Sequence, residues 1–87
     1  MNKSEEILGL RQPLAWFANA MEHQLQANDH KTGWQGMTDR QLLNRLKQET
    51  TELERAIESG KSVVEEAADV ANFAMMIADN FTDRAEP

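Results

Sequence analysis

Four acidic residues occupy mirror-image positions on the two sides of one predicted turn. Glu49 and Glu52 precede the turn, which we place at residues 59–61. Glu66 and Asp69 follow it. The inner two acids are each seven residues from the first position of the turn, and the outer two are each ten residues from it. Because each residue rises by about 1.5 Å along a helix, an antiparallel pair of helices would bring the four acids to matching heights in two layers.

Acids gathered in this way predict a cation site. Carboxylates held at one place repel one another unless positive charge lies between them. Hard divalent cations take carboxylate oxygens as ligands, so a divalent cation is the natural candidate. Glu52 could be a direct ligand or a general base, and the sequence leaves that division open.

The positions of the acids on their helices strengthen this interpretation. At about 100° per residue, Glu49 and Glu66 fall inside apolar stripes, whereas Glu52 and Asp69 fall at stripe edges. Burying an ionised carboxylate without a partner is costly, so acids on an apolar face need a reason to be there. The alternative is a solvated charged face, or salt bridges with nearby cations. These cations are Arg45, Lys47 and Arg55.

Composition favours a small, all-α domain. Ala, Leu, Glu and Met are plentiful, β-branched residues are sparse, and no proline interrupts the middle of the chain. We expect a single all-α domain over residues 13–83, preceded by a segment at 1–12 with room for a short helix and followed by a tail at 84–87. A chain of 87 residues has a marginal core on its own, so we expect a helical bundle completed as a homodimer or homotetramer.

Net charge and hydropathy exclude several partners. The formal net charge of -6 argues against a nucleic-acid backbone, which needs a basic surface. It does not exclude a nucleotide, because a bound cation reverses the local sign of charge. No apolar run approaches the roughly 20 residues of a membrane span, and the first residues lack the apolar core of a signal peptide. We therefore expect a soluble cytoplasmic protein that does not bind membranes.

Three helices account for most of the chain. The first begins at Pro13 and ends near Asn28, and a glycine-containing loop follows at residues 29–37. The second opens with a capping box at Thr38 and ends at Gly60. The third opens with a second capping box at Ser62 and frays after residue 80. Their apolar stripes are Leu14, Phe17, Met21 and Leu25; Leu42, Leu46, Leu53 and Ile57; and Val63, Ala67, Val70, Ala74, Ile77 and Phe81.

The loop before the second helix offers groups for binding a nucleobase. His30, Lys31 and Trp34 lie there, and base recognition needs stacking surfaces with a few polar edges. Trp34 fits stacking and simple packing equally well, and His30 fits a solvated loop residue at least as well as a base contact. Asn72, one turn beyond the second acid pair, could assist at the site or be an ordinary surface residue. Trp16 lies off its apolar stripe, where it could pack at a subunit interface.

The acid pattern resembles a known metal signature. Residues 49–52 (ETTE), 13 intervening residues and residues 66–69 (EAAD) are similar to the motif of the MazG-like, all-α nucleoside triphosphate pyrophosphatases. That group includes the dimeric dUTPases and the dCTP pyrophosphatases. The resemblance covers roughly residues 14–80, and short MazG-like proteins of phages and bacterial mobile regions are closest in size.

The resemblance implies an oligomeric helical bundle. It also implies hydrolysis of a nucleoside triphosphate to the monophosphate and pyrophosphate, with Mg²⁺ as cofactor and Mn²⁺ as a substitute. By position, the metal ligands and catalytic acids are Glu49, Glu52, Glu66 and Asp69.

Two alternatives to this enzyme remain open, and a departure from the motif favours the first. Gln48 stands where the family commonly has its first Glu. A degenerate relative that binds nucleotide or metal without turnover is the first alternative. A helical interaction module whose acids are structural is the second.

Overall fold

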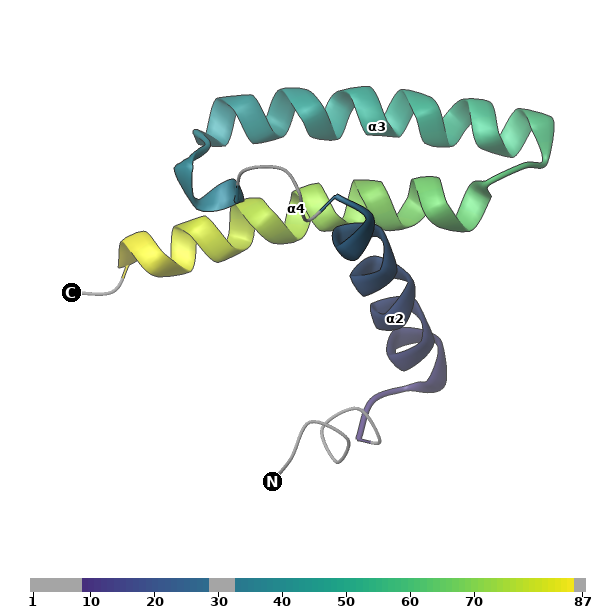
Figure 1. The fold of residues 1–87 in the computed structure, drawn as a ribbon, viewed down its shortest axis with the longest axis horizontal. Coiled ribbons are helices and arrows are strands. Elements are labelled where there is room, and N and C mark those ends of the chain that lie inside the picture. The colour runs from purple at the N-terminus through teal and green to yellow at the C-terminus, as the bar shows by residue number, and fades with distance from the viewer. Residues whose placement is uncertain (1–8, 29–32, 86–87) are drawn as a thin grey trace.

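The chain folds into a helical hairpin with one further helix laid against it (Figure 1). The computed structural model describes residues 9–28 and 33–85, and only the backbone of the last three of these. In order, the elements are α2 (Gln12–Ala27), the short 3₁₀ turn η1 (Trp34–Gly36), α3 (Asp39–Ser59) and α4 (Val63–Ala85). These described segments contain no strand, so the all-α expectation is confirmed. The short helix expected within residues 1–12 falls largely outside the described residues.

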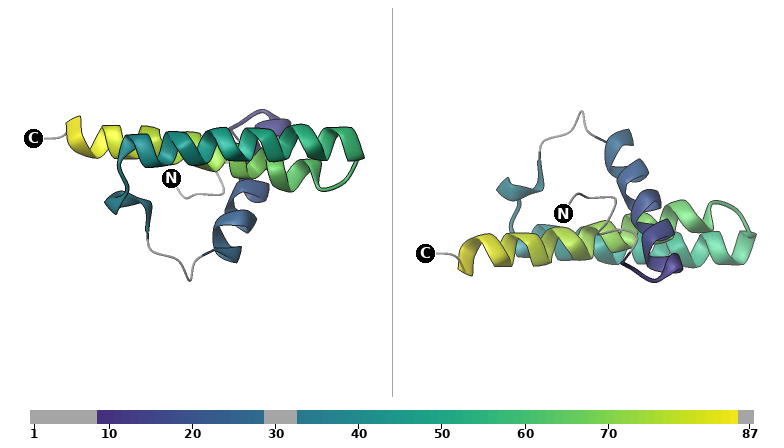
Figure 2. Two further views of the ribbon diagram at one scale, coloured as in Figure 1. Left: turned by 90° about the horizontal axis from the view of Figure 1, so that it is seen from above. Right: turned by 90° about the horizontal axis from the view of Figure 1, so that it is seen from below.

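The antiparallel helices α3 and α4 lie side by side, and both α2 and η1 contact α4. Helix α2 crosses the hairpin obliquely, so that its C-terminal end and η1 project on the same side of it (Figure 2). Helix α2 contacts α4 near the middle of that helix, with its N-terminal end directed away from the hairpin (Figure 1). Among the described helices, none is long and apolar enough to cross a membrane.

Both ends of α3 form as the sequence predicts. The Thr38 hydroxyl accepts a hydrogen bond from the Gln41 backbone N–H at 3.1 Å, and the Gln41 side chain accepts one from the Thr38 N–H at 2.9 Å. This is the reciprocal capping box. At the other end, Gly60 adopts a left-handed conformation with φ 74°, and its N–H donates to the Ala56 carbonyl at 2.8 Å. The glycine ends the helix because it takes this conformation without steric cost.

The expected capping box at Ser62 is wrong, although α4 does begin at the next residue. Ser62 has φ 61°, a left-handed conformation, whereas the first residue of a capping box is extended. The connection between the helices is so short that the chain reverses through two left-handed residues, Gly60 and Ser62. The expected fraying after Asn80 is also wrong, because α4 continues to Ala85. No glycine or other proline stands between Asn80 and Pro87 to end the helix.

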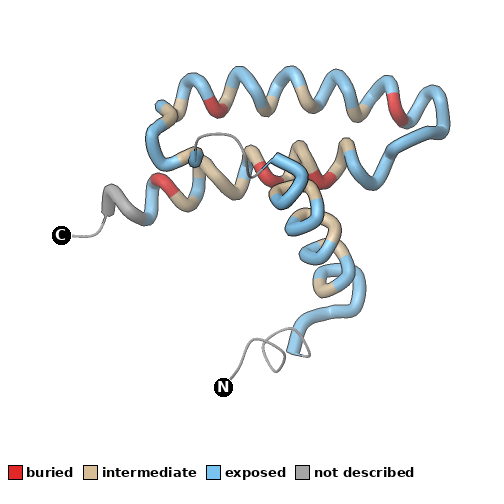
Figure 3. Tube along the Cα trace, viewed as in Figure 1, coloured by how far each residue is buried: buried red, intermediate tan, exposed pale blue. Residues whose placement is uncertain are grey.

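The core is thin and lies within the hairpin (Figure 3). Leu42 and Ala56 of α3 and Ala68 of α4 are its buried apolar residues among those described. The small alanine side chains let the two helices approach closely. Asn72 and Asn80 of α4 are also buried, although no pattern in the sequence placed them in the core.

The predicted apolar stripes are only partly covered. Four of their large residues lie near the ends of their helices and are exposed. They are Leu14, Ile57, Val63 and Phe81. Ala74, near the middle of α4, is also exposed, whereas Ala68 lies outside the predicted stripe and is buried. The predicted stripes therefore have the correct helical spacing, but they extend over residues that are exposed. The stripe predicted for α4 is also not centred on the buried face of that helix.

Polar contacts hold the first helix in place. The Asn72 side-chain N–H donates to the Met21 backbone carbonyl at 3.0 Å, and that of Asn80 donates to the Trp34 carbonyl at 3.0 Å. No residue of α2 is fully buried. The position of α2 and η1 thus depends on side-chain amides that reach backbone carbonyls, as well as on partly buried apolar residues.

Candidate functional site

Three of the four predicted acids come together. Glu49 from α3 and the pair Glu66 and Asp69 from α4 each place a carboxylate oxygen within 4.8 Å of the others. All three side chains are partly buried. The antiparallel hairpin produces this cluster because it sets residues at equal distances from the turn side by side.

The fourth acid is directed elsewhere. Arg55 donates a hydrogen bond to Glu52 at 3.0 Å, and the Glu52 side chain is 48% exposed. The salt-bridge alternative is therefore correct for Glu52, and in part for Glu49, which lies 3.6 Å from Arg45. Glu52 still lies close enough for its charge to help raise the pKa of Glu66.

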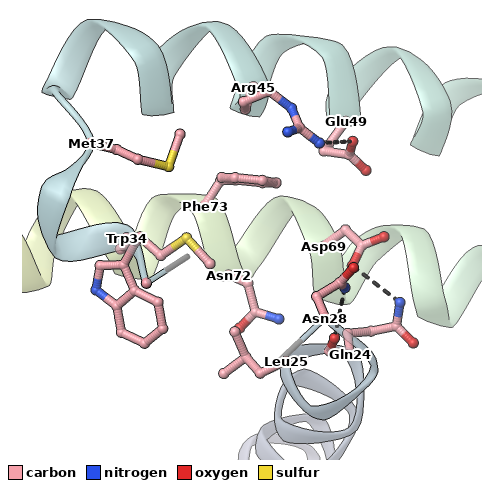
Figure 4. A pocket seen from close by; sticks show the side chains of 12 residues that line it. Gln24, Leu25, Asn28, Trp34, Met37, Arg45, Glu49, Asp69, Asn72 and Phe73 are labelled. Atoms are coloured by element: carbon pink, nitrogen blue, oxygen red, sulfur yellow. Dashed lines mark hydrogen bonds and ion pairs between the residues drawn. The ribbon is translucent and has the colours of Figure 1, made fainter. Parts of the chain in front are cut away.

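Neighbouring side chains orient two of the clustered acids (Figure 4). The Gln24 amide of α2 donates to Asp69 at 3.1 Å. Arg45 lies 3.6 Å from Glu49 and also stands over the ring of Phe73, 5.0 Å from its centroid. A cation over an aromatic face is held by the charge distribution of the ring. Arg45 therefore has two partners, and it balances part of the negative charge at one corner of the cluster.

Glu66 has the least favourable environment of the three. Its Oε2 is buried and has no hydrogen-bond partner among the described residues. Desolvation by burial raises the pKa of Glu66 above its ordinary value of 4.5, and the charges of Asp69 and Glu49 raise it further. A buried anionic oxygen without a partner, beside two more carboxylates, fits a divalent cation that takes oxygen ligands.

An open pocket of about 720 Å³ adjoins the cluster. It lies between the end of α2, η1 and the hairpin, with Glu49 and Asp69 toward one end and Trp34 toward the other (Figure 4). Its lining is a mixture of polar and apolar residues. They are Gln24, Leu25, Asn28, Gly33, Trp34, Met37, Arg45, Glu49, Asp69, Asn72, Phe73 and Met76. This volume lies within the range of small-molecule sites.

The predicted substrate-binding residues have different outcomes. His30 and Lys31 lie outside the described residues. Trp34 lines the pocket, and its indole N–H donates to Asp79 at 3.0 Å. Asn72 also lines the pocket but is only 3% exposed, so it is not an ordinary surface residue.

Sequence reasoning missed the partners that hold these groups. Gln24, Phe73 and Asp79 contribute to the site, and none was singled out from the sequence. Gln24 and Asp79 each form a hydrogen bond with a residue 45 positions away, and Phe73 of α4 lies under Arg45 of α3. Helical periodicity shows which residues share a face of one helix, and it does not show how two helices are paired.

The chain matches no protein-family model, no curated protein and no solved structure. The resemblance to MazG-like enzymes therefore rests on the residues and spacing of the two acidic segments, 49–52 and 66–69.

Glu66→Gln should change how stability depends on pH when divalent cations are removed with EDTA. A raised pKa means that the folded protein holds the Glu66 proton more tightly than the unfolded chain does. The free energy of unfolding should fall as pH rises from about 4.5 through the raised pKa. The substitution removes this loss. The free energy of unfolding of the variant, relative to that of the wild type, should therefore be higher at about pH 8 than at about pH 4.

Urea unfolding followed by circular dichroism measures this difference. Glu65→Gln, at the exposed neighbouring position, is the matched control and should show a smaller change. A difference between wild type and Glu66→Gln that is the same at both pH values would contradict the assigned environment.

Proposed function

We propose that this protein is a Mg²⁺-dependent nucleoside triphosphate pyrophosphohydrolase of the MazG-like, all-α type. One observation carries the proposal: Glu49, Glu66 and Asp69 converge, Glu49 and Asp69 line one end of a pocket, and a buried Glu66 oxygen lacks a partner among the described residues. A highly anionic substrate can approach an acidic cluster only with cations between them. The cluster and the pocket together therefore support a metal-assisted reaction on a phosphate ester or anhydride.

The clustered acids would hold the cation. Glu49, Glu66 and Asp69 offer carboxylate oxygens to Mg²⁺, with Mn²⁺ as a substitute. When bound, such ions neutralise phosphate charge and lower the pKa of coordinated water. Gln24 keeps Asp69 in position through its hydrogen bond.

The reaction is the hydrolysis of the anhydride bond between the α- and β-phosphates. A water oxygen forms a bond to the α-phosphorus, and the bond from that phosphorus to the bridging oxygen breaks. Pyrophosphate leaves with the bonding electron pair. The proton of the water passes to a carboxylate, for which Glu52 is a candidate because it is exposed and close to the cluster.

Among the described residues, Arg45 is the cation best placed to meet the phosphates. It lines the pocket and is about half exposed, and its present partners are Glu49 and the ring of Phe73. Since a salt bridge at 3.6 Å on a part-exposed surface is weak, Arg45 can exchange the Glu49 carboxylate for a phosphate oxygen at little cost.

Binding without turnover is the second candidate function. Glu52 is paired with Arg55 and is not one of the three clustered acids, and Gln48 stands where the family motif has an acid. Both features favour a protein that keeps the metal and nucleotide but has lost part of the catalytic set.

We also propose that the protein is a homodimer or homotetramer, and the exposed apolar side chains support this. Large hydrophobic residues remain on the surface of the hairpin and of α2. They include Leu14, Trp16, Ile57 and Phe81. Trp16 lies beside Phe17, with ring centroids 6.2 Å apart, so the two rings form one apolar surface that a second subunit can cover.

Sedimentation equilibrium should show a dimer or tetramer, and Trp16→Glu should shift it toward monomer. A charge in the middle of an apolar interface opposes association. Ala18→Glu is the control, because Ala18 is exposed and two residues further along the same helix, where the new charge faces away from the Trp16 side. A wild-type protein that is monomeric at all concentrations would contradict the proposal.

Pyrophosphate release tests the proposed activity. With a panel of ribo- and deoxyribonucleoside triphosphates, we expect pyrophosphate and monophosphate in the presence of Mg²⁺ and neither in EDTA. Glu49→Gln and Asp69→Asn should each lower kcat/KM by about 100-fold or more, because each removes a proposed ligand. Glu54→Gln, at an exposed position on α3, should leave the rate unchanged.

Three results would decide against this assignment. Release of orthophosphate in place of pyrophosphate would contradict the reaction. Full activity in both ligand variants would contradict the site. Nucleotide binding without any release would leave the non-catalytic alternative in its place.

A further inference from the structure

Arg45 is a positive charge that already stands at the edge of the acidic cluster. Its Nη2 lies 3.6 Å from Oε2 of Glu49, one turn away on α3. Its guanidinium carbon lies 5.0 Å from the centroid of the Phe73 ring of α4. The side chain is 45% exposed and lines the pocket. One cation is therefore in contact with a proposed metal ligand, an aromatic ring and the open space of the pocket.

The cluster has little other positive charge beside it. Among the described residues, Arg45 forms the one ion pair that involves a clustered acid. Asp69 accepts a hydrogen bond from the neutral amide of Gln24, and the buried Oε2 of Glu66 has no partner in the described part of the chain. Three carboxylates thus share one neighbouring cation, which leaves most of their mutual repulsion unbalanced.

A divalent cation at the cluster competes with Arg45 for the Glu49 carboxylate. Two positive charges beside one carboxylate repel each other, so the affinity for the divalent cation is lower while the guanidinium stays there. The contact of Arg45 with Glu49 is weak, because the two atoms are 3.6 Å apart and the arginine is about half exposed. An ion that takes oxygen ligands from all three acids can therefore displace Arg45 from Glu49.

Phe73 determines where the displaced guanidinium stays. A cation over an aromatic face is attracted by the charge distribution of the ring, and this attraction does not need the carboxylate. Figure 4 shows the ring beneath the Arg45 side chain, and both residues line the pocket. Once released from Glu49, Arg45 therefore remains beside the pocket with N–H donors available to a ligand there.

We propose that Arg45 is the resident counter-ion of the acidic cluster, and that a divalent cation bound at Glu49 releases its guanidinium for a phosphate group in the pocket. The inference rests on the proposed function, since it takes the metal site as given. It goes beyond that function by ordering two binding events, the cation first and the phosphate second. Arg45 then couples the two sites, so that each ligand strengthens the binding of the other.

Titration with Mn²⁺ in the absence of nucleotide, followed by the electron paramagnetic resonance signal of the free ion, tests the competition. Arg45→Gln removes the competing charge and should bind Mn²⁺ about threefold or more tightly than the wild type does. Loss of a side chain with a merely structural role would not strengthen binding. Arg45→Lys keeps the charge and should stay near the wild-type affinity. Lys47→Gln is the matched control, because it removes one positive charge from an exposed position on the same helix, and it should have a smaller effect.

Nuclear magnetic resonance of the arginine side chains tests the release. The Nε–H signal of Arg45 is identified by its absence from Arg45→Lys. This signal should move when Mg²⁺ is added to the wild-type protein. Inorganic phosphate should then move it further, whereas phosphate added in EDTA should move it little. The Nε–H signal of Arg55, which is paired with Glu52, should respond less at each step.

Three results would overturn the inference. They are Mn²⁺ binding by Arg45→Gln that is no tighter than by the wild type, an equal gain in Lys47→Gln, and a response of the Arg45 signal to phosphate that is the same in Mg²⁺ and in EDTA. No Mn²⁺ binding by either protein would remove the metal site and this inference together.

Neither assay depends on hydrolysis, so the inference and the proposed activity can fail separately. Tighter Mn²⁺ binding by Arg45→Gln without any pyrophosphate release would remove the proposed activity alone. Pyrophosphate release by the wild type, with an unchanged Mn²⁺ affinity in Arg45→Gln, would remove this inference alone.

Discussion

Repulsion among Glu49, Glu66 and Asp69 is the constraint around which this fold is organised. Their oxygens lie within 4.8 Å of one another, and burial raises the pKa of Glu66 because its charge has lost water without gaining a partner. The hairpin imposes this proximity. Its tight turn at Gly60 pairs the two helices so that Glu49 of α3 lies near Glu66 and Asp69 of α4. We therefore expect neutral residues at these positions to make the protein more stable in the absence of a cation.

The pocket depends on the same hairpin through longer-range contacts. Asn72 joins α2 to α4 by a hydrogen bond, and Asn80 joins η1 to α4 in the same way. Both walls of the pocket are therefore attached to one helix. Gln24 joins the first wall directly to Asp69. Displacement of α2 would therefore alter the acidic cluster and the pocket together. This coupling gives a small protein with a thin core a defined site.

Local rules predicted the hairpin and most of the cluster from sequence. Capping at Thr38, the turn at Gly60 and equal spacing from that turn were sufficient, because each depends on residues close in the chain. The exposure of Phe81 and the burial of Asn72 could not be predicted in that way. Each depends on where one helix stops covering another. In Asn72 the partner is a backbone carbonyl 51 residues away, and nothing in the side-chain pattern identifies it.

Titration with Mn²⁺, followed by the electron paramagnetic resonance signal of the free ion, tests the proposed metal site most directly. We expect the wild-type protein to remove Mn²⁺ from solution, Glu66→Gln to weaken binding by about tenfold or more, and Glu65→Gln to leave binding unchanged. Weak protein sites for divalent cations have dissociation constants of up to about 1 mM. If the wild-type protein bound no Mn²⁺ at about that concentration, the proposed metal site would be contradicted. Equal binding by the wild type and Glu66→Gln would contradict it as well.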